Sequence, residues 1–157
     1  MILAIDPGNK ESGYCFLNKD YTPRIFDKVD NETLRDLLRF YLTTGMITEA
    51  VIEKVASYGM PVGETVFDTC IWIGRFTELL HTCDIPVEYV RRKEYVVDLC
   101  GSPKAKDSNV IQYLIDRFAS DTPNHGKGTK SDPGWFYGFK KDVWQAYAIG
   151  VWYLDKS

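Results

Sequence analysis

The chain has 157 residues, of which 45% are hydrophobic, 14% aromatic and 26% charged. A chain of this length and composition can bury a sizeable core without disulfides or a structural metal, and it is unlike disordered, collagen-like or coiled-coil proteins. No apolar run approaches the about 20 residues of a membrane span, and Asp6 interrupts the apolar N-terminus before a signal peptide could form. We therefore expect one domain over residues 1–157 in a soluble, cytoplasmic protein.

The formal net charge of −3 conceals a gradient along the chain. Residues 86–141 contain ten Lys and Arg residues against seven Asp and Glu, whereas the remainder contains nine against fifteen. The total argues against a generic nucleic-acid coat protein, but the basic segment suits a phosphate backbone. The acidic surplus elsewhere leaves carboxylates available for chemistry.

The four cysteines show no C-x-x-C pair and stand mostly within apolar stretches. This pattern favours reduced thiols in the core over a zinc site or disulfides. The residues concerned are Cys15, Cys70, Cys83 and Cys100.

Short apolar segments rich in β-branched residues predict strands at the beginning of the chain. Residues 2–6 form the first, which places Asp6 at its C-terminal end, ahead of a Pro-Gly turn. Residues 13–17 and 24–29 predict two more strands joined by a hairpin-type connection. Asn31 is a good N-cap for an amphipathic helix that follows directly.

That first helix is expected to end at Gly45, and residues 50–55 then predict a strand of the buried type. Glu53 is anomalous there, because charged side chains are rarely buried without partners. A long helix over residues 64–82 follows, with one apolar side.

The last part of the chain adds one strand, three helices and a loop. The order of elements predicts a mixed α/β sheet with helices on both faces. The expected elements are a strand at 87–90, a short helix at 93–99, a helix capped by Asp107 or Ser108, a Gly- and Lys-rich loop at 120–138 and a closing helix at 140–154.

Three carboxylates stand where apolar neighbours make them costly: Asp6, Glu53 and Asp142. If the first and fourth strands are neighbours, Asp6 and Glu53 point to one place, and the start of the last helix can pack above them. Like charges gathered there need a cation, and oxygen ligands select Mg²⁺ or Mn²⁺. Two such ions roughly 4 Å apart can promote the displacement of an oxygen at phosphorus, one by activating water and the other by stabilising the leaving oxygen. The pattern therefore permits a metal-dependent phosphodiesterase.

Each of these carboxylates also has a purely structural interpretation. Asp6 precedes Pro-Gly and could simply form the turn. Glu53 could pair with Lys54 or Arg75 at a strand edge, and Asp142 could cap the last helix. The joint occurrence of the three in this order of strands and helices favours the functional interpretation.

Five motifs occur in order along the chain: Ile-Leu-Ala-Ile-Asp-Pro-Gly at residues 2–8, Ser-Gly-Tyr at 12–14, Val-Ile-Glu at 51–53, residues 105–110, and Asp142 followed by Ala146 and Ala148. This ordered set resembles the motifs of RuvC-type Holliday junction resolvases. Segments 56–63, 72–76 and 104–109 are similar to the variant typical of phages and prophages.

This resemblance implies an RNase H-like fold with a central mixed five-stranded sheet flanked by helices on both faces. It also implies a homodimer that binds four-way DNA junctions and nicks two strands symmetrically, a crossover junction endodeoxyribonuclease. By the same resemblance, Asp6, Glu53 and Asp142 would be the catalytic carboxylates and would bind Mg²⁺, with Mn²⁺ as a substitute. The family usually has a further aspartate where this chain has Gln145, whose amide oxygen is a weaker, uncharged ligand.

Other residues are assigned to DNA by the resemblance and by charge. Tyr58 and Met60 lie in the loop after the fourth strand, where the family often carries a wedge that stacks on bases; covering the sheet edge is the alternative. Lys106, and next Lys104, are candidates to contact the scissile phosphate. Backbone-neutralising charge comes from Arg91, Arg92, Lys93, Lys127 and Lys130.

The helix over residues 64–82 has more apolar surface than one buried face requires. The extra residues are Phe67, Ile71 and Trp72, and they suit a two-fold dimer interface, as the resemblance implies. A wholly buried central helix is the alternative.

Three other functions remain open at this point. Gln145 in place of an acidic ligand is compatible with a junction-binding protein that lacks nuclease activity. A related RNase H-like nuclease could act on other branched or RNA-containing substrates. An actin-like nucleotide binder shares the early Asp-Gly turn, but that fold needs two such domains and a longer chain.

Overall fold

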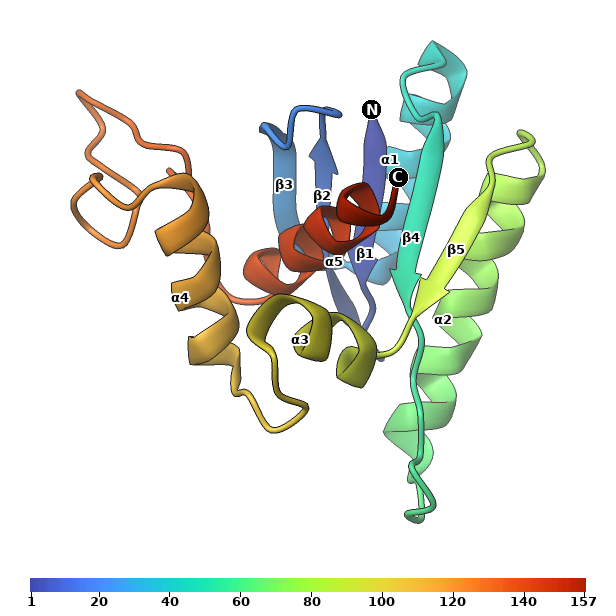
Figure 1. Cartoon of the computed structure of the whole chain (residues 1–157). Coiled ribbons are helices and arrows are strands. Elements are labelled where there is room, and N and C mark those ends of the chain that lie inside the picture. Colours follow the sequence, from blue (N-terminus) through green and yellow to red (C-terminus); the bar gives the residue numbers. More distant parts are fainter.

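Five extended segments form one mixed sheet in the computed structural model of the protein, which describes residues 1–157 (Figure 1). The strand order is β3-β2-β1-β4-β5, with β1 antiparallel to β2, β2 antiparallel to β3, and β4 parallel to both β1 and β5. The strands are β1 (Ile2–Asp6), β2 (Glu11–Leu17), β3 (Pro23–Asp30), β4 (Glu49–Glu53) and β5 (Val87–Val90).

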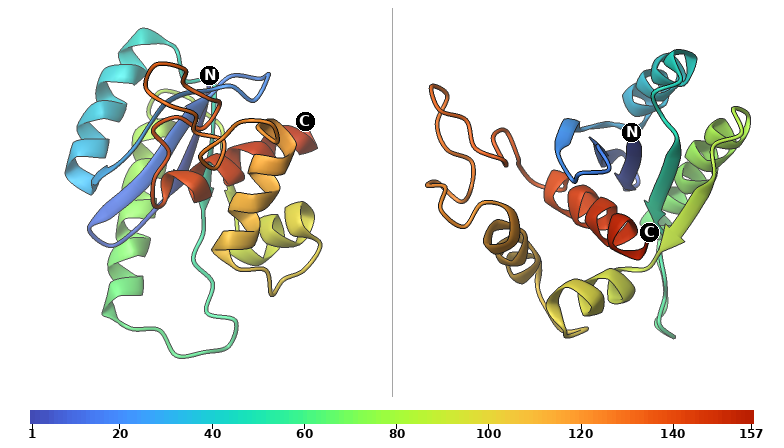
Figure 2. Two further views of the ribbon diagram at one scale, coloured as in Figure 1. Left: turned by 90° about the vertical axis from the view of Figure 1, so that its left-hand side faces the viewer. Right: turned by 45° about the horizontal axis from the view of Figure 1, so that its top comes forward.

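Helices cover both faces of this sheet (Figure 2). Side chains alternate between the faces along each strand, so Leu3 and Ile5 pack with the helices on one face while Ile2 and Ala4 pack with those on the other. The first face carries α1 (Asn31–Thr44) and α2 (Glu64–His81), and the second carries α3 (Arg92–Cys100), α4 (Asp107–Phe118) and α5 (Val143–Lys156). The predicted mixed sheet with helices on both faces is confirmed.

Helix α5 crosses the second face and is buried along almost its whole length. Aromatic side chains from the preceding segment, Phe136 and Phe139, pack around Trp144 and Tyr147 of the helix. Because aromatic clusters of this kind bury large apolar areas, they fix the start of α5 against the sheet.

The turn after β1 is held by two buried polar residues, and one of them differs from its predicted role. Asn31 is the first residue of α1 and not its N-cap, which is Asp30. Its side-chain amide donates to the Gly8 carbonyl at 2.8 Å and accepts from the Ser12 hydroxyl at 2.5 Å. Asn31 therefore ties α1 to the β1–β2 turn.

Several other boundaries and burials differ from expectation. Strand β4 ends at Glu53, and α5 begins at Val143 because the residues before it form turns. The cysteines are all free thiols, but the prediction that they are mostly core residues is wrong: Cys15 is buried, whereas Cys70 and Cys83 are exposed. No helix combines the length and the apolar character that crossing a membrane requires.

Candidate active site

Parallel pairing of β1 and β4 brings two carboxylates to the same end of the sheet. The register pairs Ile5 with Ile52, so Asp6 and Glu53 are the next residues on their strands. Asp6 continues the alternation of Ile2 and Ala4, and Glu53 continues that of Val51, so both belong to the face covered by α5. Strand order and alternation together place these two residues side by side.

The start of α5 carries the third carboxylate to this place. Asp142 is the N-cap of α5, and its backbone passes directly over Gly13, the residue opposite Asp6 in β2. A Cβ atom built at Gly13 would lie 2.7 Å from the Asp142 carbonyl oxygen and 2.9 Å from its Cβ. Glycine is therefore required for Asp142 to approach Asp6 this closely.

Asp142 has a basic partner that sequence reasoning missed. Lys28 of β3 lies opposite Gly13, and its Nζ is 2.8 Å from Asp142 Oδ2. The hydrogen bond and the charge of Asp142 raise the pKa of Lys28. Side chains alternate between the two faces along β3, and pairing with Gly13 places Lys28 on the face of the carboxylates; this pattern could have identified Lys28.

Burial and like charges concentrate negative potential at this site. The pKa of Asp6 lies well above its usual range, first because burial disfavours the charged form, then because Glu53, Asp142 and Asp107 repel it. Burial also raises the pKa of Glu53, while the Tyr95 hydroxyl and Arg92 oppose that shift. Asp107, which the sequence suggests only as a helix cap, thus belongs electrostatically to the same group.

Gln145 is buried and takes part in a network with Tyr95 and Arg92. The Tyr95 hydroxyl lies 2.9 Å from Glu53 Oε1 and 3.1 Å from Gln145 Oε1, and its single proton serves one of them at a time. Arg92 Nη1 donates to the Tyr95 hydroxyl at 3.2 Å and to Gln145 Oε1 at 3.4 Å. Its Nη2 lies 2.6 Å from Asp107 Oδ1.

The donor set suits a hard cation, although the side chains are not arranged around one. In this structure no three His, Cys, Asp or Glu side chains are positioned together as metal ligands. Carboxylate oxygens are nevertheless the ligands that Mg²⁺ and Mn²⁺ prefer, and the mutual repulsion that raises the pKa of Asp6 is what a cation would relieve. Asp142 would have to leave Lys28 to join Asp6 and Glu53.

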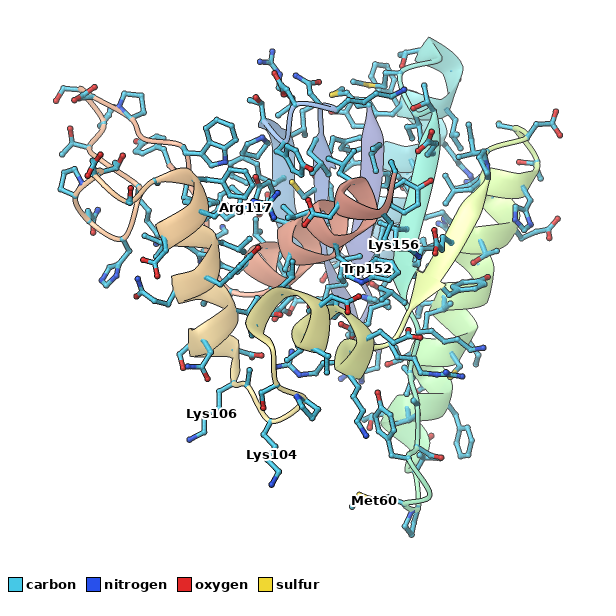
Figure 3. All side chains as sticks on the ribbon, viewed as in Figure 1. Met60, Lys104, Lys106, Arg117, Trp152 and Lys156 are labelled. Atoms are coloured by element: carbon cyan, nitrogen blue, oxygen red, sulfur yellow. The ribbon has the colours of Figure 1, made fainter.

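The residues predicted to bind DNA are spread over different parts of the surface. Lys104 and Lys106 extend into solvent from the α3–α4 connection, and Met60 stands at the tip of the loop between β4 and α2 (Figure 3). Lys127 and Lys130 belong to the segment between α4 and α5, which projects away from the Met60 loop (Figure 1). The structure therefore does not join them into one continuous stripe.

A second group of these residues lines one cavity of about 550 Å³. Tyr58, Arg91 and Lys93 lie on its wall together with Trp152 and Lys156. The Lys93 backbone N–H donates to the Tyr58 hydroxyl at 3.4 Å, and the Lys93 ammonium lies 5.7 Å from the centre of the Tyr58 ring. Tyr58 remains 56% exposed, which leaves its ring accessible to a ligand.

The sheet order, the flanking helices and the carboxylates at the ends of β1 and β4 define an α/β fold of the RNase H-like class. Two solved structures of RuvC share it. A Thermus thermophilus RuvC structure superposes with a TM-score of 0.67 at 12% sequence identity, over 99% of this chain and 95% of that one. T. thermophilus RuvC in complex with a Holliday junction substrate gives 0.67 at 13% identity, over 96% and 90%.

No protein-family model matches the sequence, and no curated protein matches it. The RuvC-type fold that the motifs predicted is confirmed by the structural likeness. At this sequence identity the likeness concerns the fold, and the chemistry has to be argued from the residues of this chain.

Proposed function

We propose that the protein is a Holliday junction resolvase, a metal-dependent endonuclease that nicks branched DNA. The observation that carries this proposal is the convergence of Asp6, Glu53 and Asp142 at one end of the sheet. It is supported by the fold, which is shared with a RuvC bound to a Holliday junction substrate.

Asp6, Glu53 and Asp142 would hold Mg²⁺ or Mn²⁺, with the Gln145 amide oxygen as a neutral ligand. Such ions, when bound, supply the positive charge that activates water and stabilises the leaving oxygen, in the two-metal-ion form that we propose. Asp142 first leaves Lys28, a local change because the two side chains are 43% and 24% exposed. In the reaction the water oxygen bonds to phosphorus, one ester P–O bond breaks, the water proton passes to a carboxylate or solvent, and the departing oxygen takes a proton from solvent.

A resolvase that nicks two strands symmetrically needs two copies of this site, and α2 offers a surface for pairing. The side chains of Phe67 and Ile71 on that helix are 59% and 58% exposed to solvent. Large apolar side chains exposed to this extent commonly mark a surface that another protein covers. We infer that a second copy of the chain covers this face in a two-fold dimer.

The decisive experiment compares a synthetic four-way junction with a linear duplex of the same sequence, with and without Mg²⁺. We expect cleavage of the junction only, and only with the metal. Glu53→Gln should reduce the rate by at least about 10³-fold, because a catalytic carboxylate is lost, while junction binding in EDTA survives. Equal cleavage of both substrates, or of neither, would refute the proposal.

One observation favours a second candidate, a junction-binding protein without nuclease activity. Asp142 is paired with Lys28, Asp107 is paired with Arg92, and Gln145 stands where a carboxylate would add charge. These pairs would then be permanent and not displaced by metal. Junction binding without nicking in Mn²⁺ as well as Mg²⁺ would support this alternative, and cleavage of an RNA-containing duplex in preference to the junction would indicate a related nuclease.

A further inference from the structure

Arg92 lies inside the carboxylate site and not on the outer DNA-binding surface. It is the first residue of α3, separated from β5 by Arg91 alone, and its guanidinium contacts Tyr95, Gln145 and Asp107 at 3.2, 3.4 and 2.6 Å. Among the basic residues predicted to bind DNA, it alone contacts this group. Lys106, the candidate for the scissile phosphate, points into solvent instead (Figure 3).

Arg92 forms one ion pair, with Asp107, and that pair is partly exposed to solvent. Two of its three partners, the Tyr95 hydroxyl and the Gln145 amide, are neutral, and the third, Asp107, is 66% exposed. A guanidinium has five N–H donors in a planar fork that matches a phosphate. The Arg92 side chain is itself 39% exposed, so an oxygen of a phosphodiester can reach it.

Gln145 adds no second negative charge beside Arg92. Beside Asp107, a second carboxylate at that buried position would overcompensate the charge of Arg92, whereas the amide holds the guanidinium by a hydrogen bond alone. The same replacement removes one negative ligand from the metal site. The site thus has less negative charge to attract a metal ion, and it contains the positive charge of the Arg92 guanidinium.

We propose that Arg92 binds a non-bridging oxygen of the phosphate that is cut, with Gln145 and Tyr95 as positioning residues that aim its guanidinium. The proposal rests on the proposed function, since it concerns the substrate of the same site. Arg92 then supplies part of the phosphate neutralisation that the weakened metal site does not.

The test first maps the cleaved phosphate with wild-type protein in Mg²⁺ or Mn²⁺. A junction is then made with a methylphosphonate at that phosphate, which replaces a charged oxygen with a methyl group. Binding of the native and modified junctions is measured in EDTA, where no metal contributes. We expect the modification to weaken wild-type binding about tenfold and Arg92→Gln binding less than about twofold.

Arg91→Gln is the matched control, because it removes the same charge one residue away without touching the carboxylates. It should weaken binding of both junctions equally and keep the tenfold difference. Gln145→Met should shrink the difference partway without lowering the melting temperature appreciably, and should add nothing in the Arg92→Gln background, as expected of a positioning residue.

The outcomes separate the two proposals. An equal methylphosphonate penalty in wild type and Arg92→Gln overturns the role of Arg92 while the nuclease activity stands. Absence of wild-type cleavage overturns both. Should Arg92→Gln fail to fold, the Arg92 Nε–Hε signal in NMR spectra of wild type decides: it must shift with the native junction and not with the modified one, and equal shifts refute the proposal.

Discussion

Replacing Gly13 with alanine should disable the site while leaving the fold intact. The new Cβ would stand 2.7 Å from the Asp142 carbonyl oxygen, which is 0.7 Å inside the 3.4 Å at which ordinary contact begins. The atoms it meets are the carbonyl group and the Cβ of Asp142, which are fixed by the backbone at the start of a buried helix, so no flexible side chain can move aside. The start of α5 must retreat from β1, taking Asp142 with it.

The size of the effect follows from this geometry. Overpacking of this kind costs about 1–3 kcal/mol of folding free energy. A misplacement approaching 1 Å at a reacting centre costs about 10²-fold in rate. We therefore expect Gly13→Ala to remain folded at 25 °C and to cleave junctions roughly 10²-fold more slowly, measured by urea unfolding and by single-turnover cleavage.

Gly74→Ala provides the comparison, because a Cβ at Gly74 in α2 meets no other atom within 4 Å. There alanine should raise the unfolding free energy by about 0.5–1 kcal/mol through its better helix propensity. If Gly13→Ala were as stable and as active as wild type, the close approach of Asp142 to the sheet could not be what forms the site.

Three further predictions concern charge and assembly. Asp6→Asn should raise the melting temperature in EDTA at neutral pH, since the pKa of Asp6 is raised in the folded state and its ionisation costs stability. The gain should shrink as the pH falls through that raised pKa and should vanish below the ~3.9 of an exposed aspartate, where both states keep the proton; a pH-independent difference would contradict this. Lys28→Met should lower the Mn²⁺ concentration for half-maximal cleavage about two- to fivefold, because Asp142 no longer has to break an ion pair worth ~0.4–1 kcal/mol before it binds metal. An unchanged Mn²⁺ requirement would show that the ion pair does not compete with metal. Ile71→Asp should convert a dimer to a monomer in sedimentation, whereas an unchanged mass would place the interface elsewhere.

The sheet and the principal carboxylates could be predicted from local patterns. The strands are indicated by apolar residues between turn formers. Asp6 is conspicuous because it ends such a run, and Glu53 because it is the charged residue within one. Because side chains alternate between the two faces of a strand, Asp6 and Glu53 lie on the same face once β1 pairs with β4 in the observed register. The strand pattern and the alternation can both be read from the few residues around each carboxylate.

The network around Gln145 could not be predicted in this way. Arg92 and Tyr95 come from α3, Gln145 from α5 and Asp107 from α4, and their contacts depend on how three helices pack on one face. Nothing in the local sequence distinguishes Arg92 from its neighbour Arg91, which lines a different cavity. Lys106 is the candidate for the scissile phosphate by resemblance alone, and the sequence offers no comparable signal for Arg92.

The carboxylates of the site are separated by almost the whole length of the chain. Asp6 belongs to the first strand, and Asp142 to the start of the last helix, so 136 residues of synthesis separate them. At about 5–20 residues per second, a ribosome needs roughly 7–27 s to pass from one to the other. During that interval the nascent chain can already pair β1 with β2 but lacks α5 and its acidic cap. The three carboxylates therefore cannot come together until α5 has been made, well after β1 and β2 can pair.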